Sequence, residues 1–149
     1  MKLLVSACLV GCPCRYDGRA FENEILKALV RKGLAVAVCP EILGGLSIPR
    51  PKAEIVGGTG DDVLSGHAKI LNEWGEDVTP HFLIGAFKVL DIALREGARY
   101  AVFKDKSPSC GVYRIYDGSF TGKTCEGSGV TTAILRKYSI SLFSNEQIR

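Results

Sequence analysis

The sequence predicts an α/β fold with a mostly parallel sheet, and three observations lead to it. Short apolar runs typical of buried strands alternate with segments whose apolar residues recur at helical spacing. Turn-forming Gly, Asp and Pro residues separate the two kinds of segment. The length of 149 residues suits one domain, because two separately cored halves would each be near the lower size limit. We therefore expect one domain over residues 1–149, a three-layer α/β/α, Rossmann-like arrangement with helices on both faces of the sheet.

The N-terminal third of the chain contains the first predicted strand, helix and strand. The apolar run at residues 2–7 (KLLVSA) is interpreted as a buried strand. Residues 21–31 carry apolar side chains at helical spacing, and Gly33 is a fitting stop for that helix. Residues 34–38 (LAVAV) form the second buried strand.

The middle of the chain is less regular. Residues 39–60 are rich in Pro and Gly and are expected to form a long connection. A helix is predicted over residues 61–71, although Gly66 weakens it. A stronger helix runs from Thr79 to the residue before Gly97, with Thr79 as its cap and Pro80 at the first helical position.

The C-terminal third continues the alternation of strands and helices. Residues 99–103 (RYAVF) form a third strand, and residues 112–116 form a strand that leads into an Asp-Gly turn. Residues 130–138 form the last helix and residues 140–143 the last strand. The Gly127-Ser128-Gly129 segment before that helix is either a plain turn or an anion site at the helix N-terminus.

Composition and charge exclude several classes of function. Lys plus Arg number 19 and Asp plus Glu 16, a net charge of +3 with no basic run, which argues against a nucleic-acid binder. No apolar run approaches the roughly 18 residues that a membrane span needs. The N-terminus resembles a lipoprotein signal up to Cys12, but it has one Lys and a short apolar stretch, so we expect a cytoplasmic protein.

Cysteine is the unusual residue type, with six copies at positions 8, 12, 14, 39, 110 and 125. Cys8 follows the first predicted strand, Cys39 the second and Cys110 the third. Because loops after parallel strands emerge at one edge of a sheet, these three thiols are expected on a common rim. Any one of them alone would be interpreted as a buried apolar residue. Together they favour a shared metal or cluster, and thiolates select zinc or iron–sulfur over harder ions.

Polar residues and glycines surround these cysteines. Ser107, Ser109 and Gly111 flank one thiol, and Glu41 lies two residues after another. Gly44, Gly45 and Arg50 belong to the loop that follows Glu41, which is expected near the same edge. Plainer interpretations remain open: Glu41 as a helix cap, Arg50 as half of a surface ion pair, and the two glycines as a turn.

Other metal and nucleotide motifs are poorly matched. The C-x3-C-x-C spacing of Cys8, Cys12 and Cys14 is one residue short of the radical S-adenosylmethionine pattern, and C-x2-C pairs are absent. A structural zinc site would need a fourth ligand from Cys12, Cys14, Cys125 or a histidine. The chain has neither a Walker A motif nor a G-x-G-x-x-G fingerprint.

Several segments taken together resemble the thiouracil desulfurase family, also known as domain of unknown function 523. The resemblance covers nearly the whole chain and is carried by Ser6-Ala7-Cys8-Leu9, Cys14-Arg15-Tyr16-Asp17-Gly18, Cys39-Pro40-Glu41, Gly44-Gly45-Leu46, Pro49-Arg50, Lys104, Ser107-Pro108-Ser109-Cys110-Gly111, Tyr116-Asp117-Gly118 and Gly127-Ser128-Gly129. Cys12 and Cys125 are extra thiols, and Cys14 fits the motif without an expected ligand role.

The resemblance implies a [4Fe–4S] cluster held by Cys8, Cys39 and Cys110, with one iron left open to capture the substrate sulfur. It further implies a redox-neutral enzyme that removes sulfur from a small thiolated base such as 2-thiouracil. Glu41 would activate water, with Ser107 and Ser109 as further catalytic residues. Arg50, Gly44, Gly45 and Gly111 would contact the substrate.

Two other classes of function stay open at this point. One is a cluster-bearing module that carries sulfide or electrons without turnover, and the other is a structural zinc or disulfide protein. The substrate would be a free base, a nucleoside or an RNA fragment, and the sequence does not choose among these or predict an oligomeric state.

Overall fold

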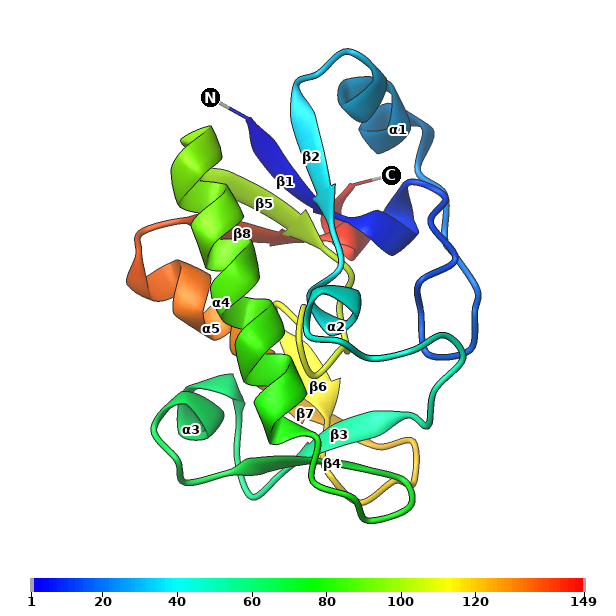
Figure 1. Ribbon diagram of the computed structural model, residues 1–149, viewed down its shortest axis with the longest axis vertical. Coiled ribbons are helices and arrows are strands. Elements are labelled where there is room, and N and C mark those ends of the chain that lie inside the picture. The colour runs from blue at the N-terminus through cyan, green and yellow to red at the C-terminus, as the bar shows by residue number, and fades with distance from the viewer. Residues whose placement is uncertain (1, 149) are drawn as a thin grey trace.

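The computed structural model describes residues 2–148. A central parallel sheet is flanked by helices, and two small antiparallel hairpins lie beside it (Figure 1). In chain order the elements are β1 Leu3–Ser6, η1 Ala7–Leu9, α1 Glu24–Arg31, β2 Ala35–Val38, α2 Pro40–Leu43, β3 Ala53–Val56, α3 Gly60–Leu64, β4 Lys69–Asn72, α4 Thr79–Glu96, β5 Tyr100–Phe103, β6 Arg114–Tyr116, β7 Thr124–Glu126, α5 Val130–Lys137, β8 Ser141–Ser144 and η2 Asn145–Gln147.

The central sheet has the strand order β2-β1-β5-β8, and all its pairs are parallel. Neighbouring residues of β1 point to opposite faces, so Leu4 packs into the cluster formed with α4 and α5, whereas Val5 packs with Leu26 of α1. The predicted α/β fold, with a parallel sheet and helices on both faces, is confirmed. Parallel strands also place the carboxyl ends of β1, β2 and β5 at one edge of the sheet, where the site lies.

The long helix α4 begins and ends almost where the sequence predicts. Gly97 follows its last residue in the left-handed conformation (φ 63°), which favours glycine as a helix stop. Thr79 does not cap the helix as predicted. It is the first helical residue, and its hydroxyl oxygen accepts the backbone N–H of Ile70 at 2.8 Å. The hydroxyl therefore satisfies an N–H of β4 and joins that strand to α4.

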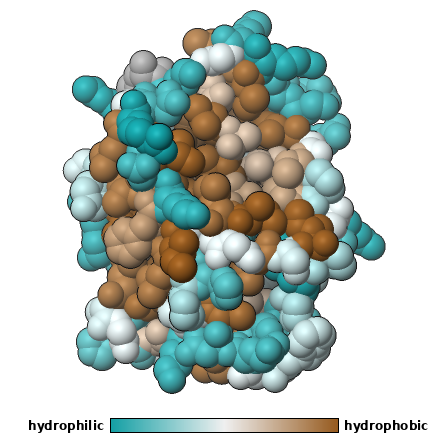
Figure 2. Space-filling view, in the orientation of Figure 1, coloured by the Kyte–Doolittle hydropathy of each residue, from teal (hydrophilic) through white to brown (hydrophobic). Residues whose placement is uncertain are grey.

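The outer face of α4 is unusually apolar for a surface helix. Ile84, Phe87 and Leu94 are exposed on it, and Figure 2 shows apolar side chains gathered over this helix. Even so, no helix within residues 2–148 has the combination of length and apolar character that crossing a membrane requires.

The segment between β2 and α4 differs most from the sequence prediction. Residues 39–60 hold α2 and β3 instead of an irregular connection, and the helix predicted over 61–71 ends at Leu64 as α3. Gly66 turns the chain with a φ of 83°, and β4 then pairs antiparallel with β3. The strand β7 was missed as well; it pairs antiparallel with β6. These hairpins lie beside the carboxyl edge of the main sheet (Figure 1).

Candidate functional site

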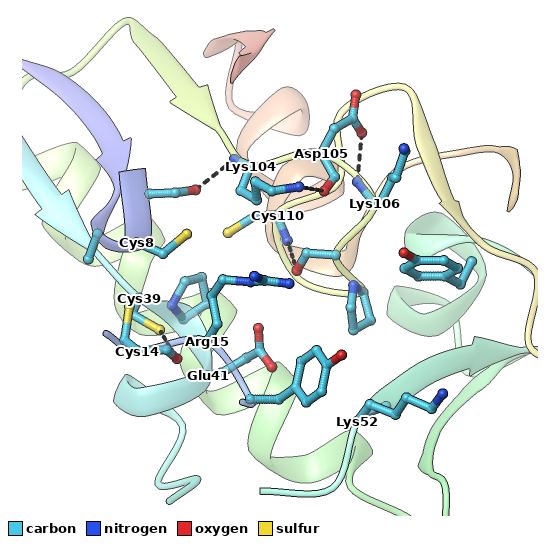
Figure 3. Close-up of a pocket in the computed structure, with 18 of the residues that line it drawn as sticks. Cys8, Cys14, Arg15, Cys39, Glu41, Lys52, Lys104, Asp105, Lys106 and Cys110 are labelled. Carbon is cyan, nitrogen blue, oxygen red and sulfur yellow. Dashed lines mark hydrogen bonds between the residues drawn. The ribbon is translucent and has the colours of Figure 1, made fainter. Parts of the chain in front are cut away.

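Cysteines from three strand ends line one cavity of about 240 Å³. Cys8 lies in η1 directly after β1, Cys39 precedes the first residue of α2 directly after β2, and Cys110 belongs to the loop after β5. Figure 3 shows the sulfurs of Cys8 and Cys110 directed toward each other across this cavity, with Cys39 beside them. All six cysteines of the chain are free thiols.

The shared cavity makes it costly for these thiols to ionise together. Burial, reinforced by the neighbouring Cys39, raises the pKa of Cys8 to about 11. Burial also raises the pKa of Cys110 well above its ordinary value. The pKa of Cys39 is lowered to about 7, because the Cys14 thiol donates a hydrogen bond to its sulfur, and the pKa of Cys14 is raised by the same contact. A bound cation that converts thiols to thiolates would remove this conflict.

This donor set fits an iron–sulfur cluster better than a single metal ion. Among residues 2–148, no three His, Cys, Asp or Glu side chains converge closely enough to hold one ion. A cluster binds each thiolate through a different iron, so its ligands lie further apart than those around a single centre. Cys8, Cys39 and Cys110 meet that requirement as soft sulfur donors around one cavity.

The loop that carries Cys110 is held by the N-terminus of α5. The N–H of Val130 donates to the Pro108 carbonyl and the N–H of Thr131 to the Ser109 carbonyl, both at 2.9 Å. Gly129 permits this approach, because a Cβ there would lie 2.8 Å from the Pro108 oxygen. These N–H groups bind the loop, so they are not free for an anion at the Gly127-Ser128-Gly129 segment, and the plain-turn interpretation holds.

Glu41 lies in α2 and accepts a hydrogen bond from the end of a chain of two serines. The Ser107 oxygen accepts the backbone N–H of Ser109 at 3.1 Å and that of Cys110 at 3.0 Å, which occupies both its lone pairs. Its hydroxyl must therefore donate to the Ser109 oxygen, 2.9 Å away. Ser109 in turn donates to Oε2 of Glu41 at 3.1 Å. The chain of donors runs from Ser107 at the cavity wall to Glu41, which accepts.

The four residues assigned to substrate from the sequence lie outside the cavity lining. Arg50 is buried and paired with Glu41. Gly44 packs against α4, where a Cβ would lie 2.9 Å from the His81 carbonyl carbon, and Gly45 turns the chain beside the same histidine. Gly111 lies against Ser107, whose carbonyl oxygen would be 2.7 Å from a Cβ. Close packing thus explains why glycine occupies positions 44 and 111, and the contact partners of Arg50 belong to the protein itself.

Several cavity residues were given no role by the sequence, notably Lys104, Arg15 and Tyr16. The Phe21 ring lies 5.0 Å from the Lys104 ammonium and 4.6 Å from the Arg15 guanidinium. Burial, with a smaller contribution from the charge of Arg15, lowers the pKa of Lys104. Lys104 directly follows β5, so the same edge rule that predicted the cysteines could have found it.

Comparisons with known proteins cover almost the entire chain. A family model described as 2-thiouracil desulfurase matches residues 3–147. The uncharacterized protein YbbK of Bacillus subtilis (strain 168) is 47% identical over 146 residues, which is 98% of this chain and 97% of that protein. The solved structure of TudS, a [4Fe-4S]-dependent thiouracil desulfidase, matches with a TM-score of 0.87 and 44% identity, over 99% of this chain and 92% of that one.

Proposed function

The chain belongs to the 2-thiouracil desulfurase family, and from this premise we propose that it hydrolyses the carbon–sulfur bond of a small thiolated pyrimidine such as 2-thiouracil. Cys8, Cys39 and Cys110 would hold a [4Fe–4S] cluster. The observation that carries the proposal is that these three thiols and Glu41 line the same cavity. When bound, the cluster supplies a soft Lewis acid at the iron that lacks a protein ligand, which draws electron density out of the carbon–sulfur bond.

The chain's own residues then provide proton transfer and orientation. Glu41 lines the cavity with a carboxylate, a group that can take a proton from water. The oxygen of that water forms a bond to the ring carbon, and the bond from this carbon to sulfur breaks. Oxygen replaces sulfur in the product, and sulfur leaves as sulfide with no net oxidation or reduction, so no electron donor is required.

Ser107 and Ser109 have different places in this scheme. Ser107 lines the cavity, where its oxygen is 2.9 Å from that of Ser109. Ser109 is fully buried, so it serves as the link between Ser107 and Glu41 and does not touch the substrate. The pair holds Oε2 of Glu41 in one orientation and offers a route for a proton between the carboxylate and the cavity wall.

The cavity volume supports a small-molecule substrate. At about 240 Å³ it lies below the range of roughly 300–1,000 Å³ usual for drug-sized ligands, and the proposed cluster must occupy part of it, so the remaining space suits nothing larger than a single base. An extended nucleic acid would have to contact the surface beyond this cavity, and the net charge of +3 supplies little general attraction for a polyanion.

The test is a comparison of Glu41→Gln with the wild type after anaerobic reconstitution with iron and sulfide. Uracil formation from 2-thiouracil and sulfide release are measured together with iron content and visible absorption. Glu41→Gln should keep the cluster and lose turnover, because the amide cannot accept the proton. Glu24→Gln is the matched control, since Glu24 is also a first-turn acid of a helix but does not line the cavity.

Two results would reject the proposal. Full activity of Glu41→Gln would show that Glu41 is not the general base. A wild-type protein that assembles four irons and releases no sulfide from thiolated bases would instead favour a sulfide carrier or redox module.

A further inference from the structure

Arg50 lies inside the protein, where its guanidinium joins three segments of the chain. Its side chain is only 4% exposed. Nη1 donates to the Ser47 carbonyl at 3.0 Å, and Nη2 donates to the Cys14 carbonyl at 2.9 Å. Nη2 and Nε lie 3.2 and 3.4 Å from Oε1 of Glu41. The guanidinium therefore contacts its own loop, the loop of Cys14, and α2.

The two oxygens of Glu41 are thereby held by different partners. Arg50 binds Oε1, while Ser109 donates to Oε2 at 3.1 Å. A carboxylate bound at both oxygens has little freedom to rotate, and its orientation is set before any substrate arrives. Four of the five N–H groups of Arg50 are directed at these protein acceptors, and Arg50 is not part of the cavity lining, so it is not placed to contact a substrate.

The Cys14 carbonyl has two hydrogen-bond donors, and one of them would be lost when Cys39 binds a metal. The Cys39 thiol makes a long contact of 3.9 Å to this carbonyl, which Arg50 also binds. A metal-bound Cys39 is a thiolate and has no hydrogen to donate. Of these two donors to the Cys14 carbonyl, only the Arg50 guanidinium then remains, and it links this carbonyl to Glu41 of α2.

We propose that Arg50 is a positioning residue that sets the orientation of Glu41 and ties α2 to the Cys14 loop, without contacting the substrate. The part that concerns Glu41 rests on the proposed function, whereas the tie to Cys14 does not. Lysine cannot replace this arginine, since one ammonium lacks the planar fork that reaches three acceptors at fixed angles.

The activity test uses Arg50→Ala and Arg50→Lys in the reconstituted enzyme, with Arg95→Ala, an exposed arginine of α4, as control. Both Arg50 variants should lower kcat by about tenfold or more at an unchanged KM and unchanged absorption per iron. Millimolar guanidinium should restore part of the kcat of Arg50→Ala and leave Arg95→Ala unaffected. Wild-type kcat in Arg50→Lys, or a raised KM at constant kcat, would overturn the proposal; the second result would indicate a substrate contact.

A second measurement, the alkylation rate of Cys14, does not depend on enzyme activity. In metal-free protein, alkylation of the buried Cys14 should become about tenfold faster in Arg50→Lys than in the wild type or Arg95→Ala, because the Cys14 carbonyl has lost the guanidinium hydrogen bond. Unchanged labelling would overturn the tie to Cys14. If the wild type proved inactive on thiolated bases, the proposed function would fail, and the labelling would still decide whether Arg50 holds the loop.

Discussion

Gly85 lies where α4 crosses α2, and replacing it with alanine should disturb the site without touching it. A Cβ at position 85 would lie 2.7 Å from the carbonyl carbon of Pro40 and closer still to its oxygen. Ordinary contact begins near 3.4 Å, so the helices must separate by at least 0.7 Å, the difference of these two distances. Pro40 stands between Cys39 and Glu41, so the displacement reaches a proposed ligand and the proposed base.

Two opposing effects decide the sign of the change in stability. Alanine is favoured over glycine inside a helix by about 1 kcal/mol, which would stabilise α4. Overpacking of a close contact costs about 1–3 kcal/mol. Because the clash is with rigid backbone and not with a flexible side chain, we expect the upper part of that range and a net loss of about 1–2 kcal/mol.

The effect on activity should exceed the effect on stability. The short α2 will move more readily than the 18-residue α4. Displacement of reacting groups by 1 Å costs on the order of 100-fold in rate, so a shift of this size predicts at least about a tenfold loss in kcat per assembled cluster. The assays are thermal unfolding and desulfurisation of 2-thiouracil normalised to iron content. Lys88→Ala, on the exposed face of the same helix, is the control. A Gly85→Ala protein that is both more stable and fully active would show that the contact between α4 and α2 does not position the site.

Two further predictions follow from the charged groups of the site. In metal-free protein, the rate of iodoacetamide labelling should rise with pH, because only the thiolate reacts. The midpoint of this rise should lie near the pKa of about 7 for Cys39 and of about 11 for Cys8. Peptide mapping that gives one common midpoint for both cysteines would contradict these values. Asp105→Asn should lower the free energy of unfolding by about 2–3 kcal/mol at pH 7, because one carboxylate oxygen accepts four backbone N–H groups, those of Lys106, Val112, Tyr113 and Arg114. Burial acts to raise the pKa of Asp105, but these hydrogen bonds outweigh it and lower the pKa below 3.8, so the stabilisation is complete above that value and lost as pH falls through the folded-state pKa. The difference between wild type and variant should therefore shrink in acid, and a difference independent of pH in denaturant titrations would argue against this role.

The placement of the cysteines followed from topology alone. Each of the three apolar runs that precede Cys8, Cys39 and Cys110 is a strand of the parallel sheet, and such strands end at one edge. The α4 helix was equally accessible to sequence reasoning, because a long amphipathic period ends at a glycine. The strands and the helix are local patterns, and the general rule that parallel strands end at one edge then brings the three cysteines together.

What the sequence could not supply came from contacts between distant segments. Arg50 appeared as a candidate for the substrate because its loop follows Glu41, yet it is buried against the carbonyl of Cys14, 36 residues away. Gly44 was expected to contact the substrate, and its small size instead admits the backbone of α4. The strand β4 was missed because its pattern begins only after the turn at Gly66. From there every second residue, Ala68, Ile70 and Asn72, is buried, but the segment was interpreted as the continuation of a helix.

We propose that the thiols of Cys8, Cys39 and Cys110 jointly bind one iron–sulfur cluster. Six single Cys→Ser variants, each reconstituted without oxygen, test it by their iron and inorganic sulfide content and by Mössbauer spectroscopy, which distinguishes one iron site from the other three. Variants at Cys12, Cys14 and Cys125 should retain four irons with one distinct site, whereas those at Cys8, Cys39 and Cys110 should lose the cluster. A full cluster in any one of the latter three variants, or its loss from the Cys12 or Cys14 variant, would show that a different set of cysteines binds the iron.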